Sequence, residues 1–212
     1  MKLFVALTVV AASLVAYSQT KPLGEIKGTV TDATGAPISG ATVSAVSQNA
    51  GFSDATLRSV KSDRNGMFDF RGGFALGSYK LYSRKDEDSY PDPLDKFYAD
   101  PKAEAQAVEL TVAHPSATAT VRLGQQAAVL AGKIVDANTG DAIRALLAFV
   151  DGQGNGHSIS VVGDYRILVP PGKDVTLMVT AMGARSNRAQ IPVAPLRLEP
   201  GQQVYMDLSV RQ

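Results

Sequence analysis

Residues 26–46 read IKGTVTDATGAPISGATVSAV, and residues 130–150 read LAGKIVDANTGDAIRALLAFV. The two stretches align across one inserted residue. Among the aligned pairs are Gly28 with Gly132, Val30 with Ile134, and Asp32 with Asp136. Self-similarity of this length is the sequence signature of an internal repeat. The chain is therefore predicted to contain two copies of one structural unit.

Each copy shows apolar and polar residues in alternation, the pattern of a half-buried β-strand. The pattern gives about seven strands before Gly124 and a similar set after it, with no convincing helix periodicity, so we expect an all-β fold. The side chains expected to face inward are Ile26, Gly28, Val30, Ala41, Val43, Ala45, Phe68, Phe70, Tyr79, Leu81, Val108, Leu110, Val112, Ala117, Ala119, Val121 and Leu123 in the first copy, and Tyr165, Ile167, Val169, Val175, Leu177, Val179, Val204, Met206, Leu208 and Val210 in the second.

Turn residues separate the predicted strands. Gly35 and Pro37 are expected to turn a first hairpin. Asn65 and Gly66 are expected to supply positive-φ residues for a tight hairpin into the strand that carries Phe68 and Phe70.

Residues 1–18, MKLFVALTVVAASLVAYS, are predicted to be a signal peptide. One Lys precedes an apolar run of about 15 residues, which is shorter than the roughly 20 that span a membrane. The mature chain then divides into domains at 22–124 and 125–212. The join at residues 123–126 is short, so we expect a semi-rigid pair.

Composition excludes several classes of protein. The chain has 21 Lys+Arg against 20 Asp+Glu, so it lacks the basic surplus that nucleic-acid binding requires. It has no Cys and two His, which excludes thiolate catalysis, disulfides, iron–sulfur clusters and Cys-ligated zinc. A disulfide-free β-protein with a signal peptide is expected to be secreted or periplasmic, most plausibly in a bacterial envelope.

Three motifs together resemble the carboxypeptidase regulatory-like domain: residues 26–46, the Ser-Asp-x-Asn-Gly-x-Phe stretch at 62–68, and the Gly-x-Tyr-x-Leu strand at 77–81. The resemblance covers residues 25–84 well and residues 128–182 more weakly, because Ala142 replaces the Pro. It implies two tandem seven-stranded transthyretin-like (prealbumin-like, carbohydrate-binding-like) β-sandwiches, the second one degenerate. Members of that family serve as accessory modules beside other proteins, so the resemblance implies a fold more than a function.

The long acidic segment 85–107, KDEDSYPDPLDKFYADPKAEAQA, interrupts the first copy. A connection of this length is commonly a functional loop or a disordered one. The candidate contacts for a ligand or partner are Tyr90, Phe97, Tyr98, Asp86 and Asp88. The alternatives are a solvated loop whose aromatic side chains fold back over a sheet edge, and a calcium site made of clustered carboxylates.

No catalytic constellation stands out. Asp151 to His157 superficially resembles a calcium loop but lacks the second acidic ligand and the distal Glu, so a Gly-rich hairpin explains it better. His114 and His157 have no recognisable nucleophile or base beside them and are interpreted as chance surface residues. Lys27 is expected on the outer face of its strand. We expect no enzyme activity and no cofactor.

These observations favour an exported, non-enzymatic β-sandwich module that recognises a carbohydrate or an envelope protein. The alternative is a structural or spacer protein of the envelope that pairs through its strand edges. An unrecognised hydrolase is the third hypothesis. The ligand is not predictable from the sequence.

Overall fold

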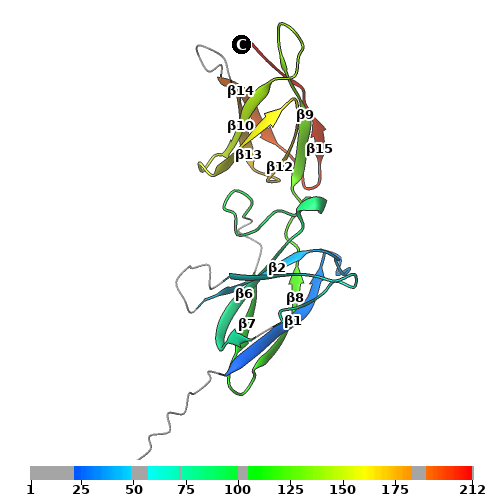
Figure 1. Cartoon of the computed structure of the whole chain (residues 1–212), viewed down its shortest axis with the longest axis vertical. Helices are drawn as coiled ribbons and strands as arrows, with labels where there is room; N and C mark the ends of the chain where they lie inside the picture. The colour runs from blue at the N-terminus through cyan, green and yellow to red at the C-terminus, as the bar shows by residue number, and fades with distance from the viewer. Residues whose placement is uncertain (1–21, 49–56, 72, 100–104, 183–189, 212) are drawn as a thin grey trace, which may run out of the picture.

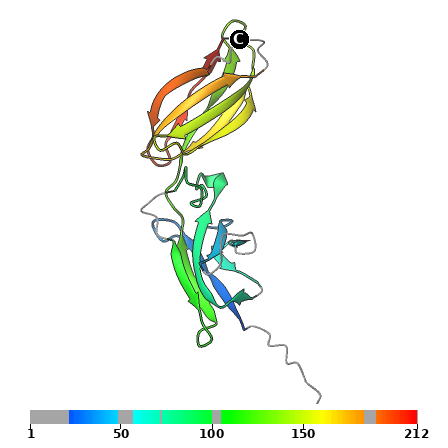
Figure 2. The same cartoon turned by 90° about the vertical axis from the view of Figure 1, so that its left-hand side faces the viewer.

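A computed structural model describes residues 22–48, 57–71, 73–99, 105–182 and 190–211. The predicted signal peptide, residues 1–18, lies outside them. Two β-domains are stacked end to end along the long axis of the molecule, with the segment after β6 between them (Figures 1 and 2). No helix among the described residues has the length and apolar character needed to cross a membrane.

The first domain contains two facing four-stranded sheets. One sheet has β1 at its centre, flanked on opposite edges by β4 and, in parallel, by β8, and the short β5 pairs with the start of β1. Its strands are β4 (Met67–Asp69), β1 (Leu23–Thr31), β5 (Phe74–Ala75) and β8 (Ser116–Arg122). The other sheet has the order β3 (Leu57–Lys61), β2 (Thr42–Ser47), β6 (Gly77–Arg84), β7 (Gln106–Leu110).

The second domain repeats this topology. Its first sheet joins β12 (Asp164–Val169), β9 (Ala128–Asp136), and the two short strands β15 (Gln203–Tyr205) and β16 (Leu208–Val210), which both lie parallel to β9. Its second sheet has the order β11 (Gly156–Val162), β10 (Arg144–Asp151), β13 (Asp174–Ala181), β14 (Gln190–Arg197). The internal repeat in the sequence thus corresponds to two sandwiches with equivalent strand orders.

The number of strands differs slightly from seven in each domain. The described part of the first domain adds the two-residue β5 to seven longer strands. In the second domain the last strand is interrupted between β15 and β16, because the side chain of Asp207 accepts the hydrogen bond from the Lys133 backbone N–H (2.8 Å) that a neighbouring strand would otherwise receive.

Each domain has its own hydrophobic core, and the alternation in the sequence predicts most of its members. Ile26, Val30, Phe68 and Leu81 are buried in the first core, and Tyr165, Ile167, Val175 and Leu177 in the second. Val112 is an exception: β7 ends at Leu110, and Val112 is exposed to solvent.

Equivalent glycines let the parallel strands of each domain approach closely. A Cβ atom on Gly28 would collide with the backbone oxygen of Ala119 in β8, and a Cβ on Gly132 would collide with that of Met206. The glycines that align in the two copies of the repeat therefore occupy the same crowded position in the two sandwiches.

The predicted first hairpin is only local: Thr31 and Pro37 form an antiparallel bridge across the turn, but β1 and β2 are not its two arms. Gly35 does adopt a positive φ of 90°, but β1 and β2 belong to opposite sheets. The Asp32 carboxylate accepts hydrogen bonds from the backbone N–H groups of Thr34 and Ala36 and holds the turn between the sheets.

The predicted hairpin at Asn65–Gly66 is wrong, because β3 and β4 lie in different sheets. Only Gly66 has a positive φ (75°). The Asp63 side chain accepts hydrogen bonds from the N–H groups of Asn65 (2.8 Å) and Met67 (2.9 Å), so an aspartate organises this crossing as well.

Candidate functional site

Residues 85–99, here called the clamp loop, are the first described part of the long acidic segment 85–107, whose last two residues begin β7 (Gln106–Leu110). The clamp loop follows β6 of the first domain and forms the 3₁₀ turn η2 (Asp86–Asp88). It then reaches the end of the second domain that faces the first (Figure 1). Asp95 stabilises the last turn: its carboxylate accepts a hydrogen bond from the Phe97 N–H (2.9 Å), and its carbonyl accepts from the Tyr98 N–H (3.0 Å). This turn presents two adjacent aromatic side chains to the second domain.

Phe97 is buried in the hydrophobic core of the second domain, although it belongs to the segment that follows β6 of the first. Its exposed fraction is 1%. Its ring centroid lies 5.4 Å from that of Phe149 in β10, 5.4 Å from that of His157 in β11, and 5.0 Å from that of Tyr98. The second sandwich thus completes its core with a residue from the other domain's loop.

Tyr98 packs beside Phe97 on the same core. Its ring stacks on His157 with centroids 5.6 Å apart and an interplanar angle of 22°. Its hydroxyl donates a hydrogen bond of 3.1 Å to the carbonyl of Leu168 in β12. Burial, together with the negative charges of Asp95 and Asp86, raises the pKa of Tyr98 to about 12, so the phenol is neutral at physiological pH.

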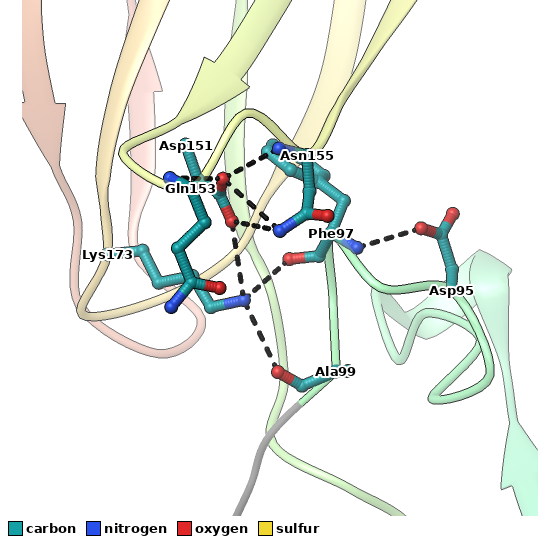
Figure 3. A network of polar contacts seen from close by, with 7 residues as sticks. All are labelled: Asp95, Phe97, Ala99, Asp151, Gln153, Asn155 and Lys173. Carbon is teal, nitrogen blue, oxygen red and sulfur yellow. Dashed lines mark hydrogen bonds and ion pairs between the residues drawn. The ribbon is translucent and has the colours of Figure 1, made fainter.

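Lys173 fixes the backbone of the clamp loop from the side of the second domain (Figure 3). Its ammonium donates hydrogen bonds to the carbonyls of Phe97 (2.9 Å) and Ala99 (3.3 Å). The carboxylate of Asp151 lies 3.9 Å from the same ammonium. Lys173 and Asp151 therefore connect the β12–β13 turn, the β10–β11 hairpin and the clamp loop.

Asp151 is held as a carboxylate by its own hairpin. Its Oδ1 accepts hydrogen bonds from the backbone N–H groups of Gln153 (2.9 Å) and Asn155 (2.9 Å), and the Asn155 side chain donates to Oδ2 (3.2 Å). Burial alone would raise the pKa of Asp151, but these hydrogen bonds and the charge of Lys173 outweigh it and lower the pKa below its usual value. The Gly-rich segment is a hairpin between β10 and β11, as predicted.

Ser89 is a second point of contact between the domains. It has a positive φ of 64° and is buried. Its hydroxyl accepts a hydrogen bond from Arg166 of β12 (3.0 Å), and its carbonyl accepts from the Ala127 N–H (2.7 Å) in the short join between the domains. Gln126 of the same join donates to the Asp88 carbonyl (2.9 Å). The join is thereby tied to the clamp loop.

The interpretation of His157 as a chance surface residue is wrong. Its Nε2 lies 2.7 Å from the Asp95 carboxylate, with the N–H out of line for a hydrogen bond, and its ring contacts Phe97 and Tyr98. His114 is exposed in the β7–β8 turn. Sequence reasoning also missed Lys173, Asp151 and Ser89 as contacts between domains: Lys173 and Ser89 lie in no recognisable motif, and the Gly-rich hairpin that Asp151 begins gives no sign of a domain contact.

The structure does not gather the predicted contact residues into one exposed surface. Phe97 and Tyr98 face the second domain, whereas Tyr90 packs on the core of the first. Asp86 and Asp88 are exposed on the outside of η2 and form ion pairs with Arg84 and Lys85. Within the described residues, no three His, Asp or Glu side chains are arranged to hold a metal ion.

These features define a two-domain β-sandwich protein whose domains are in contact through a loop. Residues 25–87 match the family model of the carboxypeptidase regulatory-like domain, which confirms the resemblance for the first domain. Assignment of the second domain to the same family stays a prediction. No curated protein matches the chain.

Three of the similar solved structures are distant likenesses. The Bacillus anthracis TIE protein is 14% identical over 89% of this chain and 33% of that one, with a TM-score of 0.33. The Streptococcal ancillary pilin is 17% identical over 92% and 64%, with a TM-score of 0.42. The minor pilin GBS52 of Streptococcus agalactiae is 10% identical over 88% and 94%, with a TM-score of 0.39. The chain spans about a third of the first of these proteins and less than two thirds of the second.

Proposed function

We propose that this chain is an exported, non-enzymatic module of the cell envelope that acts as a rigid spacer or accessory arm. The insertion of Phe97 into the core of the second domain is the observation that supports this function most strongly. A flexible tether would leave the two sandwiches to reorient, whereas a shared core side chain couples their positions. The apolar segment 1–18 supports export.

The contacts around Phe97 favour the spacer over recognition through the clamp loop. A ligand-binding aromatic side chain must be accessible, but Phe97 is 1% exposed and the Tyr98 hydroxyl is bonded to Leu168. The polar contacts of Lys173, Arg166 and Gln126 likewise point from the second domain and the join to the loop. The two aromatic side chains of the clamp loop, Phe97 and Tyr98, are therefore already occupied by contacts with the second domain of the same chain.

The rigidity is measurable because the chain has no Cys. Spin labels at Lys80→Cys in the first domain and Lys133→Cys in the second, both exposed, report the distance between domains by pulsed electron resonance. We expect one narrow distance distribution that broadens in Phe97→Ala and not in Tyr205→Ala, which removes an exposed aromatic ring of the second domain. A broad distribution in the otherwise native chain would sink the spacer proposal.

Recognition of a glycan or envelope protein through the clamp loop is the second candidate, and the exposed carboxylates Asp86 and Asp88 favour it. Thermal unfolding of residues 19–212 with a panel of oligosaccharides and calcium tests it. A ligand at 100 times its Kd adds about 2.7 kcal/mol. A thermal shift that Asp86→Asn/Asp88→Asn abolishes would favour this function, and a flat panel would favour the spacer.

A further inference from the structure

The first domain carries a groove whose lining includes no residue of the clamp loop. Its volume is about 470 Å³, within the range of small-ligand sites. β1 and β4 form its floor, Thr118 of β8 borders one side, and the end of β3 borders the other. Lys27, Lys61 and Arg71 contribute the positive charges, and Met67 contributes an exposed apolar side chain.

The three cationic side chains of this groove have no side-chain partner in the part of the chain that the structure describes. Lys27 stands opposite Asp69 in the β1–β4 register, but no described residue forms an ion pair or side-chain hydrogen bond with Lys27, Lys61 or Arg71. Since the whole chain has 21 basic and 20 acidic residues, such a cluster is not a consequence of a basic composition.

The two carboxylates that border the groove are not equivalent. Asp63 already accepts hydrogen bonds from two backbone N–H groups. Asp69 has no side-chain partner among the described residues and remains available as a hydrogen-bond acceptor. With respect to the described residues, the groove therefore offers three free cationic donors, one free carboxylate acceptor and an apolar side chain.

The backbone that carries Arg71 is fixed. Arg58 of β3 donates hydrogen bonds to the carbonyls of Arg71 (3.0 Å) and Gly73 (3.0 Å), and its guanidinium lies 4.4 Å from the centre of the Phe74 ring. The charged head of Arg71 is thus held on a rigid support at the end of β4, which lowers the entropic cost of binding.

We propose that this groove binds an acidic oligosaccharide that contains uronate residues. The carboxylates of the sugar would pair with Lys27, Lys61 and Arg71, sugar hydroxyls would donate to Asp69, and the apolar face of a ring would lie on Met67. A simple inorganic anion would use the cations but be repelled by Asp69, whereas a sugar uses both. This inference is independent of the spacer role.

Calorimetric titration of the mature chain with oligogalacturonate tests the proposal, with the methyl ester of the same oligomer as the uncharged control ligand. We expect Lys27→Gln/Lys61→Gln/Arg71→Gln to weaken binding at least tenfold, since hydrogen bonds to charged groups are the strong ones. The matched variant Lys80→Gln/Lys133→Gln/Arg144→Gln removes three exposed charges elsewhere and should bind within about twofold of the native chain. Circular dichroism checks that both variants fold.

Asp69→Asn separates a sugar from a plain polyanion. Loss of the carboxylate should weaken oligogalacturonate binding several-fold, because sugar hydroxyls exchange a charged acceptor for a weaker, neutral amide oxygen, whereas it should tighten binding of a polyglutamate peptide. The proposal is overturned by absence of oligogalacturonate binding, by equal binding of the methyl ester, by equal losses in the two triple variants, or by tighter binding in Asp69→Asn. A preference for polyglutamate would reassign the groove to an acidic protein partner.

Discussion

The ammonium of Lys173 donates a hydrogen bond of 2.9 Å to the backbone carbonyl of Phe97, although the two residues are 76 positions apart and belong to different domains. Lys173 holds the backbone of the clamp loop at the point where the Phe97 side chain enters the second core. The polar and apolar parts of the domain contact are therefore centred on the same residue.

Phe97→Ala should destabilise the second domain by about 3–5 kcal/mol, the usual cost of truncating a buried Phe. Urea unfolding of residues 19–212 measures this change. Tyr205→Ala, at a residue that is 82% exposed, serves as the control and should change the free energy of unfolding by less than about 0.5 kcal/mol. A cost for Phe97→Ala as small as that of the control would contradict the burial of Phe97 in the second core.

Lys173→Met keeps most of the apolar stem but removes the donor. The carbonyls of Phe97 and Ala99 then lose a partner, so we expect a loss of about 1–3 kcal/mol and more rapid hydrogen exchange in the clamp loop. Lys133→Met, at an exposed position of β9, should change neither the stability nor the hydrogen exchange of the clamp loop. Unchanged exchange in Lys173→Met would mean that the aromatic contacts alone hold the loop.

Asp151 makes stability depend on acid pH. Its pKa is lower in the folded chain than in the unfolded chain, so its contribution is complete above the ordinary aspartate value of about 4 and is lost as the pH falls through the folded value. Urea midpoints between pH 2 and 6 should therefore fall less steeply for Asp151→Asn than for the native chain. Parallel curves would show that Asp151 is not stabilised as a carboxylate. Asp164→Asn, in an exposed part of β12, is the control.

Two tyrosines make stability depend on alkaline pH. Burial raises the pKa of both Tyr98 and Tyr165 to about 12. The negative charges of Asp95 and Asp86 add to this effect at Tyr98, and that of Asp207 adds to it at Tyr165. An unfolded Tyr ionises near 10, so the unfolded state binds fewer protons between pH 10 and 12, and stability falls across that interval. Tyr98→Phe should reduce this fall. Absorbance at 295 nm, which reports tyrosinate, should show that these two phenols ionise only near pH 12. Complete ionisation of both by about pH 10.5 would contradict their burial.

Gly28→Ala and Gly132→Ala should each destabilise their own domain by about 1–3 kcal/mol or more, because the new methyl group meets the backbone of a parallel neighbour. Gly124→Ala, where an added Cβ meets nothing within 4 Å, should be neutral. Differential scanning calorimetry gives both effects. If Gly132→Ala left the stability of the second domain unchanged, Gly28 and Gly132 would not be structurally equivalent.

The sequence predicts which face of a strand is buried more reliably than it predicts which strands pair with each other. Alternation identifies Ile26, Phe68 and Tyr165 as inward-facing because burial of one face fixes the period of two. It does not say which sheet a strand joins, so turns such as Asn65–Gly66 look like hairpins although they connect opposite sheets. Both crossings instead depend on an aspartate, Asp32 or Asp63, that accepts backbone hydrogen bonds.

The domain contact was less predictable. Phe97 lies in an acidic, proline-rich segment without periodicity, so nothing local marks it as a core residue. The one signal is the adjacent pair Phe97–Tyr98 in an otherwise polar loop next to a join too short to separate the domains. Its significance depends on Phe149 and His157, which are more than 50 residues away in the sequence and become neighbours only after β10 and β11 pair.

The parallel pairing of β1 with β8 has a mechanical consequence. The chain enters the first domain through β1 and leaves it through β8, and the two strands are in register from Glu25 with Ser116 to Thr31 with Arg122. β9 with β15 and β16 repeats this arrangement in the second domain. Tension applied along the chain therefore slides the paired strands past each other, and their hydrogen bonds share the force instead of opening one at a time. Resistance to pulling depends on the rate of forced unfolding, and shear of this kind slows that rate in both domains.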